Sequence, residues 1–132
     1  MQPVNILLVD DEIPFVKTLT KRLSKRELNI VAAFSGQEAL AQLEKDAAID
    51  IVVLDIKMPG MDGLETLEEI KRHYPSVEVI ILTGHSAIDS AIKGMRLGAF
   101  DYLVKPCDID RLISRMEDAV ARKRQGEEQS SD

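Results

Sequence analysis

The sequence predicts an α/β fold in which one parallel sheet is covered by helices on both faces. Five short apolar runs, several of them rich in Val and Ile, have the length of strands. Segments with apolar residues at helical spacing separate these runs. Because strand and helix alternate strictly, the strands are expected to be parallel and buried on both faces. The 132 residues suffice for one domain.

The predicted elements follow one another in a regular order. The strand candidates are Val4–Val9, Leu28–Phe34, Ile51–Leu54, Val77–Leu82 and Phe100–Val104. The apolar stripes of the helices are Val16, Leu19 and Leu23; Ala39, Leu40 and Leu43; Leu64, Leu67 and Ile70; Ile88, Ile92 and Met95; and Leu112, Met116 and Val120. Pro14 suits a first helical turn, and Ser35 or Gly36 can cap the second helix. Pro75 stops the third helix after Tyr74.

The last residues, "ARKRQGEEQSSD", differ in composition from the rest of the chain. We expect a domain over residues 1–124 and a hydrophilic tail over residues 125–132 that is disordered or begins a linker. Lys123 and Arg124 suit the negative end of the last helix dipole. A linker toward an output domain is the alternative interpretation of this segment.

Composition and charge exclude several classes of function. The net charge of -6 argues against direct binding of nucleic acid, which needs a surplus of Lys and Arg. The single cysteine, Cys107, cannot form an internal disulfide. The sequence has no signal-peptide pattern and no apolar run of about 18 residues. We therefore expect a cytoplasmic protein without membrane contact.

Polar residues follow four of the predicted strands. They are Asp10, Asp11 and Glu12 after the first strand, Asp55 after the third, Thr83 after the fourth and Lys105 after the fifth. In open parallel sheets, sites form beyond the carboxyl ends of the strands. Each residue alone has a simpler interpretation, such as a helix cap, a turn or a solvated charge. Their shared placement after separate apolar runs predicts a site.

The charges at this edge predict a cation. Two like charges about 4 Å apart repel by roughly 4 kcal/mol at an effective dielectric constant near 20. A cation must therefore balance three gathered aspartates, or a pKa must rise. Oxygen ligands favour Mg²⁺, whereas Zn²⁺ would favour His or Cys. Mg²⁺, Lys105 and Thr83 can each meet one oxygen of a phosphoryl group, with a carboxylate as the nucleophile.

Over residues 4–122 the chain resembles the receiver domains of two-component response regulators. The segments "LLVDDE", "VVLDIKMPGMDG", "IILTGH" and "DYLVKP" resemble the four signatures of that family, in order and at its usual spacing. The resemblance implies a flavodoxin-like, doubly wound, five-stranded parallel sheet of order 2-1-3-4-5 with five helices. The segment from "LTGH" to "LVKP" also resembles receivers of transcription activators of the nitrogen-regulation type.

The resemblance implies a role for each acidic residue. Asp55 matches the phosphoacceptor, and Asp10 and Asp11 match the acidic pair. Asp11 and Asp55 are expected to bind Mg²⁺ directly, with Asp10 acting mainly through bound water. The backbone carbonyl of Lys57 matches the third protein ligand.

Further positions match the residues that complete this site. Thr83 and Lys105 match the groups that hold the phosphoryl oxygens, and the Lys105–Pro106 peptide is typically cis in the family. In "MPGMDG", Gly60 and Gly63 are expected to adopt backbone angles that other residues resist.

The implied reaction transfers a phosphoryl group to Asp55 from the phosphohistidine of a sensor histidine kinase or a phosphotransfer protein. Thr83 then moves toward the phosphoryl group, and the switch aromatic Tyr102 turns inward. The responding face comprises a helix near Ala87–Leu97, the fifth strand and the helix at Asp108–Arg122. It would control an output domain or protein, and it offers a surface for a homodimer. The chain is thus expected to be a regulatory domain that assists its own phosphorylation and dephosphorylation, rather than an enzyme.

Some details stay open in the sequence. Gly94 is consistent with a mobile helix and equally with close packing. Lys57 and His85 occupy positions that influence phosphoryl lifetime, and neither would help an attacking water, so we expect a lifetime of minutes or longer. His85 and His73 are expected to be exposed residues rather than metal ligands.

Three rival functions fit less well. A phosphatase of the haloacid dehalogenase type needs a second acid where Lys57 stands, and a cap domain for which the chain is short. A flavodoxin needs a hydroxyl-rich loop where "DDEIP" would repel phosphate. A degenerate receiver that only docks would not need all five chemical positions filled with suitable residues.

Overall fold

The computed structural model describes residues 3–57 and 62–130, with side chains up to residue 127. Its five strands form one parallel sheet in the order β2-β1-β3-β4-β5. They are β1 (Val4–Val9), β2 (Leu28–Ala33), β3 (Ile51–Leu54), β4 (Glu78–Thr83) and β5 (Asp101–Val104). The predicted fold and strand order are confirmed, and the predicted strand boundaries agree within one residue.

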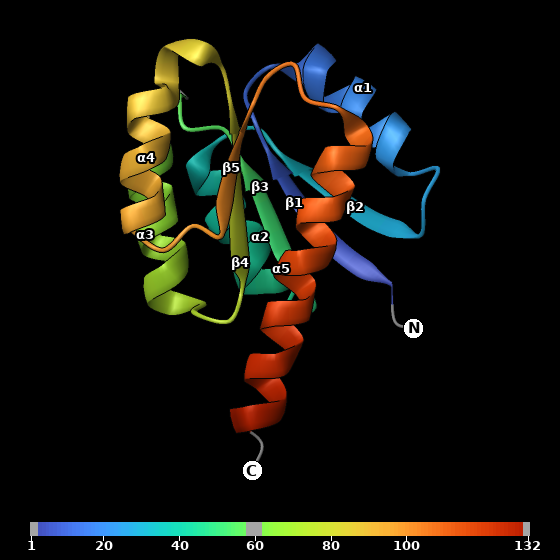
Figure 1. Cartoon of the computed structure of the whole chain (residues 1–132), viewed down its shortest axis with the longest axis vertical. Coiled ribbons are helices and arrows are strands. Elements are labelled where there is room, and N and C mark those ends of the chain that lie inside the picture. The colour runs from blue at the N-terminus through green and yellow to red at the C-terminus, as the bar shows by residue number, and fades with distance from the viewer. Residues whose placement is uncertain (1–2, 58–61, 131–132) are drawn as a thin grey trace.

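Five α-helices cover the sheet (Figure 1). They are α1 (Ile13–Leu23), α2 (Gly36–Lys45), α3 (Gly63–His73), α4 (Ile88–Arg96), which follows a short 3-10 turn η1 (His85–Ala87), and α5 (Ile109–Ser130). The expected end signals are in place. Pro14 lies in the first turn of α1, and Ser35 caps α2 by accepting a hydrogen bond from the Glu38 amide. The third helix ends before Tyr74, as Pro75 predicts.

The helices build two cores, one on each face of the sheet. In Figure 1, α1 and α5 lie on one face, whereas α2, α3 and α4 lie on the other. The first face packs Leu19 and Met116 against β1, β3 and β4. The second face packs Leu43, Leu67 and Ala91 against the same strands. The three central strands are therefore covered on both sides, as continuous apolar runs require.

The predicted apolar stripe of α4 is wrong. The buried residues of α4 are Ala91 and Gly94, whereas Ile92 and Met95 are 43% and 36% exposed. A Cβ atom at Gly94 would lie 2.3 Å from Ile81 Cδ1, so α4 approaches β4 through its smallest side chains. This contact supports close packing as the role of Gly94. The large apolar side chains are left on the outer face.

The last helix is longer than the sequence predicts. Residues 125–132 were expected to form a hydrophilic tail that is disordered or begins a linker, and in the structure α5 continues to Ser130. In Figure 1 the final turns of α5 extend past the edge of the sheet at which the strands begin. Within the part of the chain that the structure describes, neither α5 nor another helix is long and apolar enough to cross a membrane.

Candidate functional site

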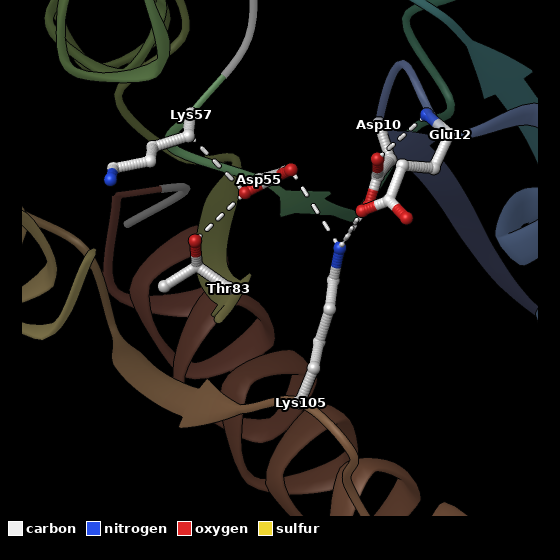
Figure 2. A network of polar contacts seen from close by, with 6 residues as sticks. All are labelled: Asp10, Glu12, Asp55, Lys57, Thr83 and Lys105. Carbon is white, nitrogen blue, oxygen red and sulfur yellow. Dashed lines mark hydrogen bonds and ion pairs between the residues drawn. The ribbon is translucent and has the colours of Figure 1, made fainter. Parts of the chain in front are cut away.

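The site residues lie immediately beyond the ends of the strands, and the neighbouring strand holds their backbone. The Asp10 amide donates to the Ala33 carbonyl at 3.1 Å, and the Asp55 amide donates to the Val9 carbonyl at 2.9 Å. The Lys105 amide likewise donates to the Thr83 carbonyl at 2.8 Å. The sheet ladder therefore fixes where these side chains begin, which is why residues far apart in the sequence meet at one edge (Figure 2).

The three predicted aspartates form one cluster, which we call the acid cluster: Asp10, Asp11 and Asp55. One carboxylate oxygen of each lies within 4.8 Å of those of the other two. Asp10 and Asp55 are buried and Asp11 is exposed. An all-oxygen donor set with one side open to water suits Mg²⁺, which keeps several water ligands. The residues present therefore fit the predicted ion.

Asp55 is held by groups from two segments. Its Oδ1 accepts hydrogen bonds from Thr83 Oγ1 at 2.8 Å and from the Lys57 amide at 3.2 Å. The Lys57 side chain points away from the acid cluster, and its Nζ donates to Ser86 Oγ at 3.3 Å (Figure 2). Where a haloacid dehalogenase needs a second acid, this chain has Lys57, whose ammonium points away from the acid cluster.

Lys105 is the cation that the structure places against the acid cluster. Its Nζ donates to Asp10 Oδ2 at 2.6 Å and lies 3.7 Å from Asp55 Oδ2. The same ammonium donates to Glu12 Oε1 at 3.2 Å and lies 4.2 Å from the centroid of the Phe15 ring. The expected cis peptide between Lys105 and Pro106 is present.

Burial and charge shift the pKa values of two of these groups. Burial raises the pKa of Asp10 above its ordinary value, and the hydrogen bond from Lys105 offsets this only in part. Burial alone would lower the pKa of Lys105, but the carboxylates of Asp10, Asp55 and Glu12 raise it above the ordinary value. Lys105 therefore stays charged, while the acid cluster as a whole favours additional positive charge.

The remaining predicted residues lie around this centre. Tyr102 lies on β5, half-buried against the α2–α3–α4 core. Gly63 is needed for close approach rather than for an unusual backbone angle, because a Cβ atom there would lie 2.4 Å from Ile56 Cα. Gly60 lies outside the described residues.

Neither histidine belongs to the acid cluster. His85 is exposed at the start of η1, and His73 lies at the end of α3, 3.1 Å from Glu69 Oε2. Two residues that contact the site were not predicted from the sequence. Phe15 contacts Lys105, and Ser86 contacts Lys57. Phe15 could have been found from its place one turn after Glu12 on the predicted first helix, whereas no sequence signal marks Ser86.

The chain resembles known proteins over most of its length. It is 38% identical over 122 residues to the transcriptional regulatory protein ZraR of Salmonella typhimurium. The matched region covers 92% of this chain and 27% of that protein. It is 40% identical over 121 residues to the DNA-binding transcriptional regulator NtrC of the same organism, covering 92% and 26%. The chain thus spans about a quarter of the length of these relatives.

Solved structures share the fold closely. A response regulator receiver domain protein from Clostridium thermocellum superposes with a TM-score of 0.88 at 36% identity, covering 92% of this chain and 98% of that one. NtrX from Brucella abortus gives a TM-score of 0.89 at 35% identity, covering 98% and 29%. The family description "Response regulator receiver domain" matches residues 6–117. On this evidence the chain belongs to the response regulator receiver domain family.

Proposed function

We propose that Asp55 accepts a phosphoryl group from the phosphohistidine of a sensor kinase or phosphotransfer protein. The observation that carries this proposal is the surroundings of Asp55, a buried carboxylate that accepts a hydrogen bond from Thr83 and lies beside Lys105 and two further aspartates. In the transfer, the P–N bond to the donor imidazole breaks and the imidazole keeps the electron pair. A P–O bond forms to an Asp55 carboxylate oxygen.

The residues around Asp55 would have different roles in this transfer. Asp11 and Asp55, with the Lys57 carbonyl, would hold Mg²⁺ directly, and Asp10 would hold it through water. When bound, Mg²⁺ would neutralise charge that develops on the phosphoryl oxygens. Thr83 and Lys105 would donate to the remaining oxygens. Mg²⁺ binding and phosphorylation are general in the family to which the chain belongs, which supports this assignment.

Phosphorylation would act on a partner by changing the packing of the face formed by α4, β5 and α5. Exposed Ile92 and Met95 place apolar surface on α4, where a partner or a second copy of the domain can cover it. When Thr83 turns from Asp55 toward a phosphoryl oxygen, the half-buried Tyr102 gains room to turn inward. Phosphorylation shifts the population of this face only by the difference in free energy that it contributes to the two packings.

The output would lie elsewhere in a longer protein. ZraR and NtrC are named as transcriptional regulators, and this chain matches only about a quarter of each. We propose that this domain controls a similar output without itself contacting nucleic acid or membrane, in keeping with its net charge of -6. Its role is regulatory and cytoplasmic.

Intact-mass measurement tests the acceptor. The protein is incubated with acetyl phosphate and Mg²⁺, and one added phosphoryl group is expected. Asp55→Asn or chelation of the metal should abolish the addition. Asp50→Asn is the matched control, because Asp50 is a buried acid at the opposite end of β3 and should leave phosphorylation intact. Addition that survives Asp55→Asn would refute the assignment, and steady hydrolysis of varied phosphate esters would favour a phosphatase.

The lifetime of the phosphorylated state is a second readout. The Lys57 ammonium is held by Ser86, and neither Lys57 nor His85 offers a carboxylate or carboxamide to orient an attacking water. After removal of acetyl phosphate, the added mass should therefore persist for minutes or longer. Loss within seconds would contradict this expectation.

A further inference from the structure

The Lys105 ammonium is held on the α1 side of the site. Its Nζ makes hydrogen bonds to Asp10 at 2.6 Å and to Glu12 at 3.2 Å, whereas Asp55 lies at 3.7 Å, beyond hydrogen-bond distance. Figure 2 shows the ammonium beside the Asp10 and Glu12 carboxylates, with Asp55 on its other side. Two of its three carboxylate neighbours thus come from the segment that leads into α1.

Glu12 has no competing structural role that explains this contact. It occupies the N-cap position of α1, yet its side chain caps no amide of that helix. Its backbone amide donates to Asp10 Oδ1 at 3.0 Å, which fixes the start of the side chain beside the acid cluster. The carboxylate is largely exposed and still reaches Lys105. Its contact with Lys105 is therefore not a by-product of capping α1.

Phe15 adds a neutral contact on the same side. The Lys105 Nζ lies 4.2 Å from the centroid of the ring, a distance at which the ring face attracts a cation. The ring also packs against the core formed with α1 and α5, so its position is fixed. Glu12 at the N-cap and Phe15 one turn later on α1 contact two sides of the ammonium, and Asp10 contacts a third.

From these contacts we infer that Glu12 and Phe15 are positioning residues that keep the Lys105 ammonium away from Asp55 until a phosphoryl group is present. An ammonium that moved onto Asp55 would neutralise the acid cluster and repel a divalent cation. An ammonium released into water would no longer be in position to donate to the phosphoryl oxygens. Held as it is, Lys105 donates to Asp10 but makes no hydrogen bond to Asp55, a proposed direct metal ligand, and it stays near that residue. The inference rests on the proposed function and adds to it two residues that act through Lys105.

The test is a double-mutant cycle read out by Mg²⁺ binding in NMR titrations. Glu12→Ala is expected to raise the Mg²⁺ dissociation constant about tenfold, the scale on which groups behind metal ligands act. In a Lys105→Met background the same change should alter it by less than about twofold, because the residue through which Glu12 acts is gone. Glu68→Ala, which removes an exposed acid from α3, controls for net charge.

A second variant tests the ring. Phe15→Leu keeps an apolar side chain but removes the aromatic face, and should raise the dissociation constant about threefold with Lys105 present and not without it. Thermal unfolding confirms that each variant is folded.

The outcomes separate the inference from the proposed function. An equal effect of Glu12→Ala in both backgrounds would mean that its charge acts through space and would overturn the inference, as would no effect in either. In both cases Mg²⁺ binding and phosphorylation of the wild-type protein would leave the proposed function standing. A wild-type protein that binds no Mg²⁺ would overturn both.

Discussion

The two edges of the sheet bury acidic side chains in different ways. Strand β3 begins after Asp50 and ends before Asp55, and both acids are buried. At the carboxyl edge, Lys105 is the cation beside the acid cluster, and it contacts Asp10 and Asp55. At the amino edge, Asp50 and Glu78 are 8% and 4% exposed, and each has at least one cation beside it.

The cations at the amino edge come from helices. Asp50 accepts a hydrogen bond from the Asn5 amide at 2.9 Å, and its Oδ1 lies 3.4 Å from Lys123 Nζ on α5. Glu78 pairs with Arg122 on α5 and lies 3.4 Å from Lys71 Nζ on α3. Hydrogen bonds and cations therefore balance these acids, whereas the acid cluster has a surplus of negative charge. Charge balance, and not burial, distinguishes a structural acid from a functional one.

Gly63→Ala should give the largest effect, because it disturbs the backbone that holds the carboxyl edge. The added Cβ atom would lie 2.7 Å from the Asp55 carbonyl oxygen as well as close to Ile56, and backbone atoms cannot yield cheaply. We expect a loss of about 3 kcal/mol in the free energy of unfolding, measured in urea. Gly84→Ala is the control, since nothing lies within 4 Å of its Cβ position. Equal losses for the two variants would contradict the packing argument.

Glu78→Gln should be the next largest. It leaves Lys71, which is mostly buried, without its countercharge, and we expect a loss of about 2 kcal/mol in the free energy of unfolding. Phosphorylation by acetyl phosphate should persist, because the amino edge is structural. Glu68→Gln, at an exposed position on α3, should change stability little. If Glu78→Gln abolished phosphorylation in a folded protein, the division between the two edges would fail.

Asp10→Asn should have the opposite sign in the absence of divalent cations. The pKa of Asp10 is raised on folding, so ionisation of this group opposes folding at neutral pH, and removing the charge should stabilise the protein by about 1 kcal/mol. The gain should shrink as the pH falls through the raised pKa, because wild-type Asp10 then becomes neutral in the folded state. Urea unfolding with a chelator present, repeated from pH 7 downward, measures this. A gain that stayed constant with pH would rule out relief of charge as its cause.

Asp110→Asn should give the smallest effect. It tests whether an exposed ion pair stabilises the protein as much as the buried ion pairs of the amino edge do. Asp110 lies 2.9 Å from Arg26, but their side chains are 76% and 52% exposed. Solvent screening limits such pairs, so we expect a change below about 0.5 kcal/mol. A loss comparable with that of Glu78→Gln would show that burial does not determine how much an ion pair contributes to the free energy of unfolding.

The carboxyl edge could be predicted because its signals are local. Each apolar run is followed directly by the residue that enters the site, and the parallel sheet brings the ends of the runs together. The resemblance then gave each position a role that composition and spacing alone do not provide. Glu12 was identified as a strand-end acid, but its contact with Lys105 depends on a side-chain direction that the sequence does not encode.

The amino edge was missed although a signal existed. Glu78 stands inside the apolar run Val77–Leu82, and Asp50 directly precedes Ile51–Leu54. One cation of Glu78, Lys71, stands only seven residues away in the sequence. Its other cation, Arg122 on α5, is 44 residues away, and Lys123 is still farther from Asp50. Asp55 was identified because it stands next to an apolar run, and these two acids could have been identified in the same way. The sequence could not tell, however, which of the acids have a cation beside them.

The sequence by itself determined the alternation of strand and helix, because apolar periodicity is a property of neighbouring residues. It also determined which polar side chains follow the strands. Only the tertiary structure decided that α4 packs through Ala91 and Gly94 and leaves Ile92 and Met95 outside, because the separation between a helix and a sheet depends on the side chains of both. It likewise decided which buried acids have cations beside them, because an ion pair joins residues that only the folded chain brings together.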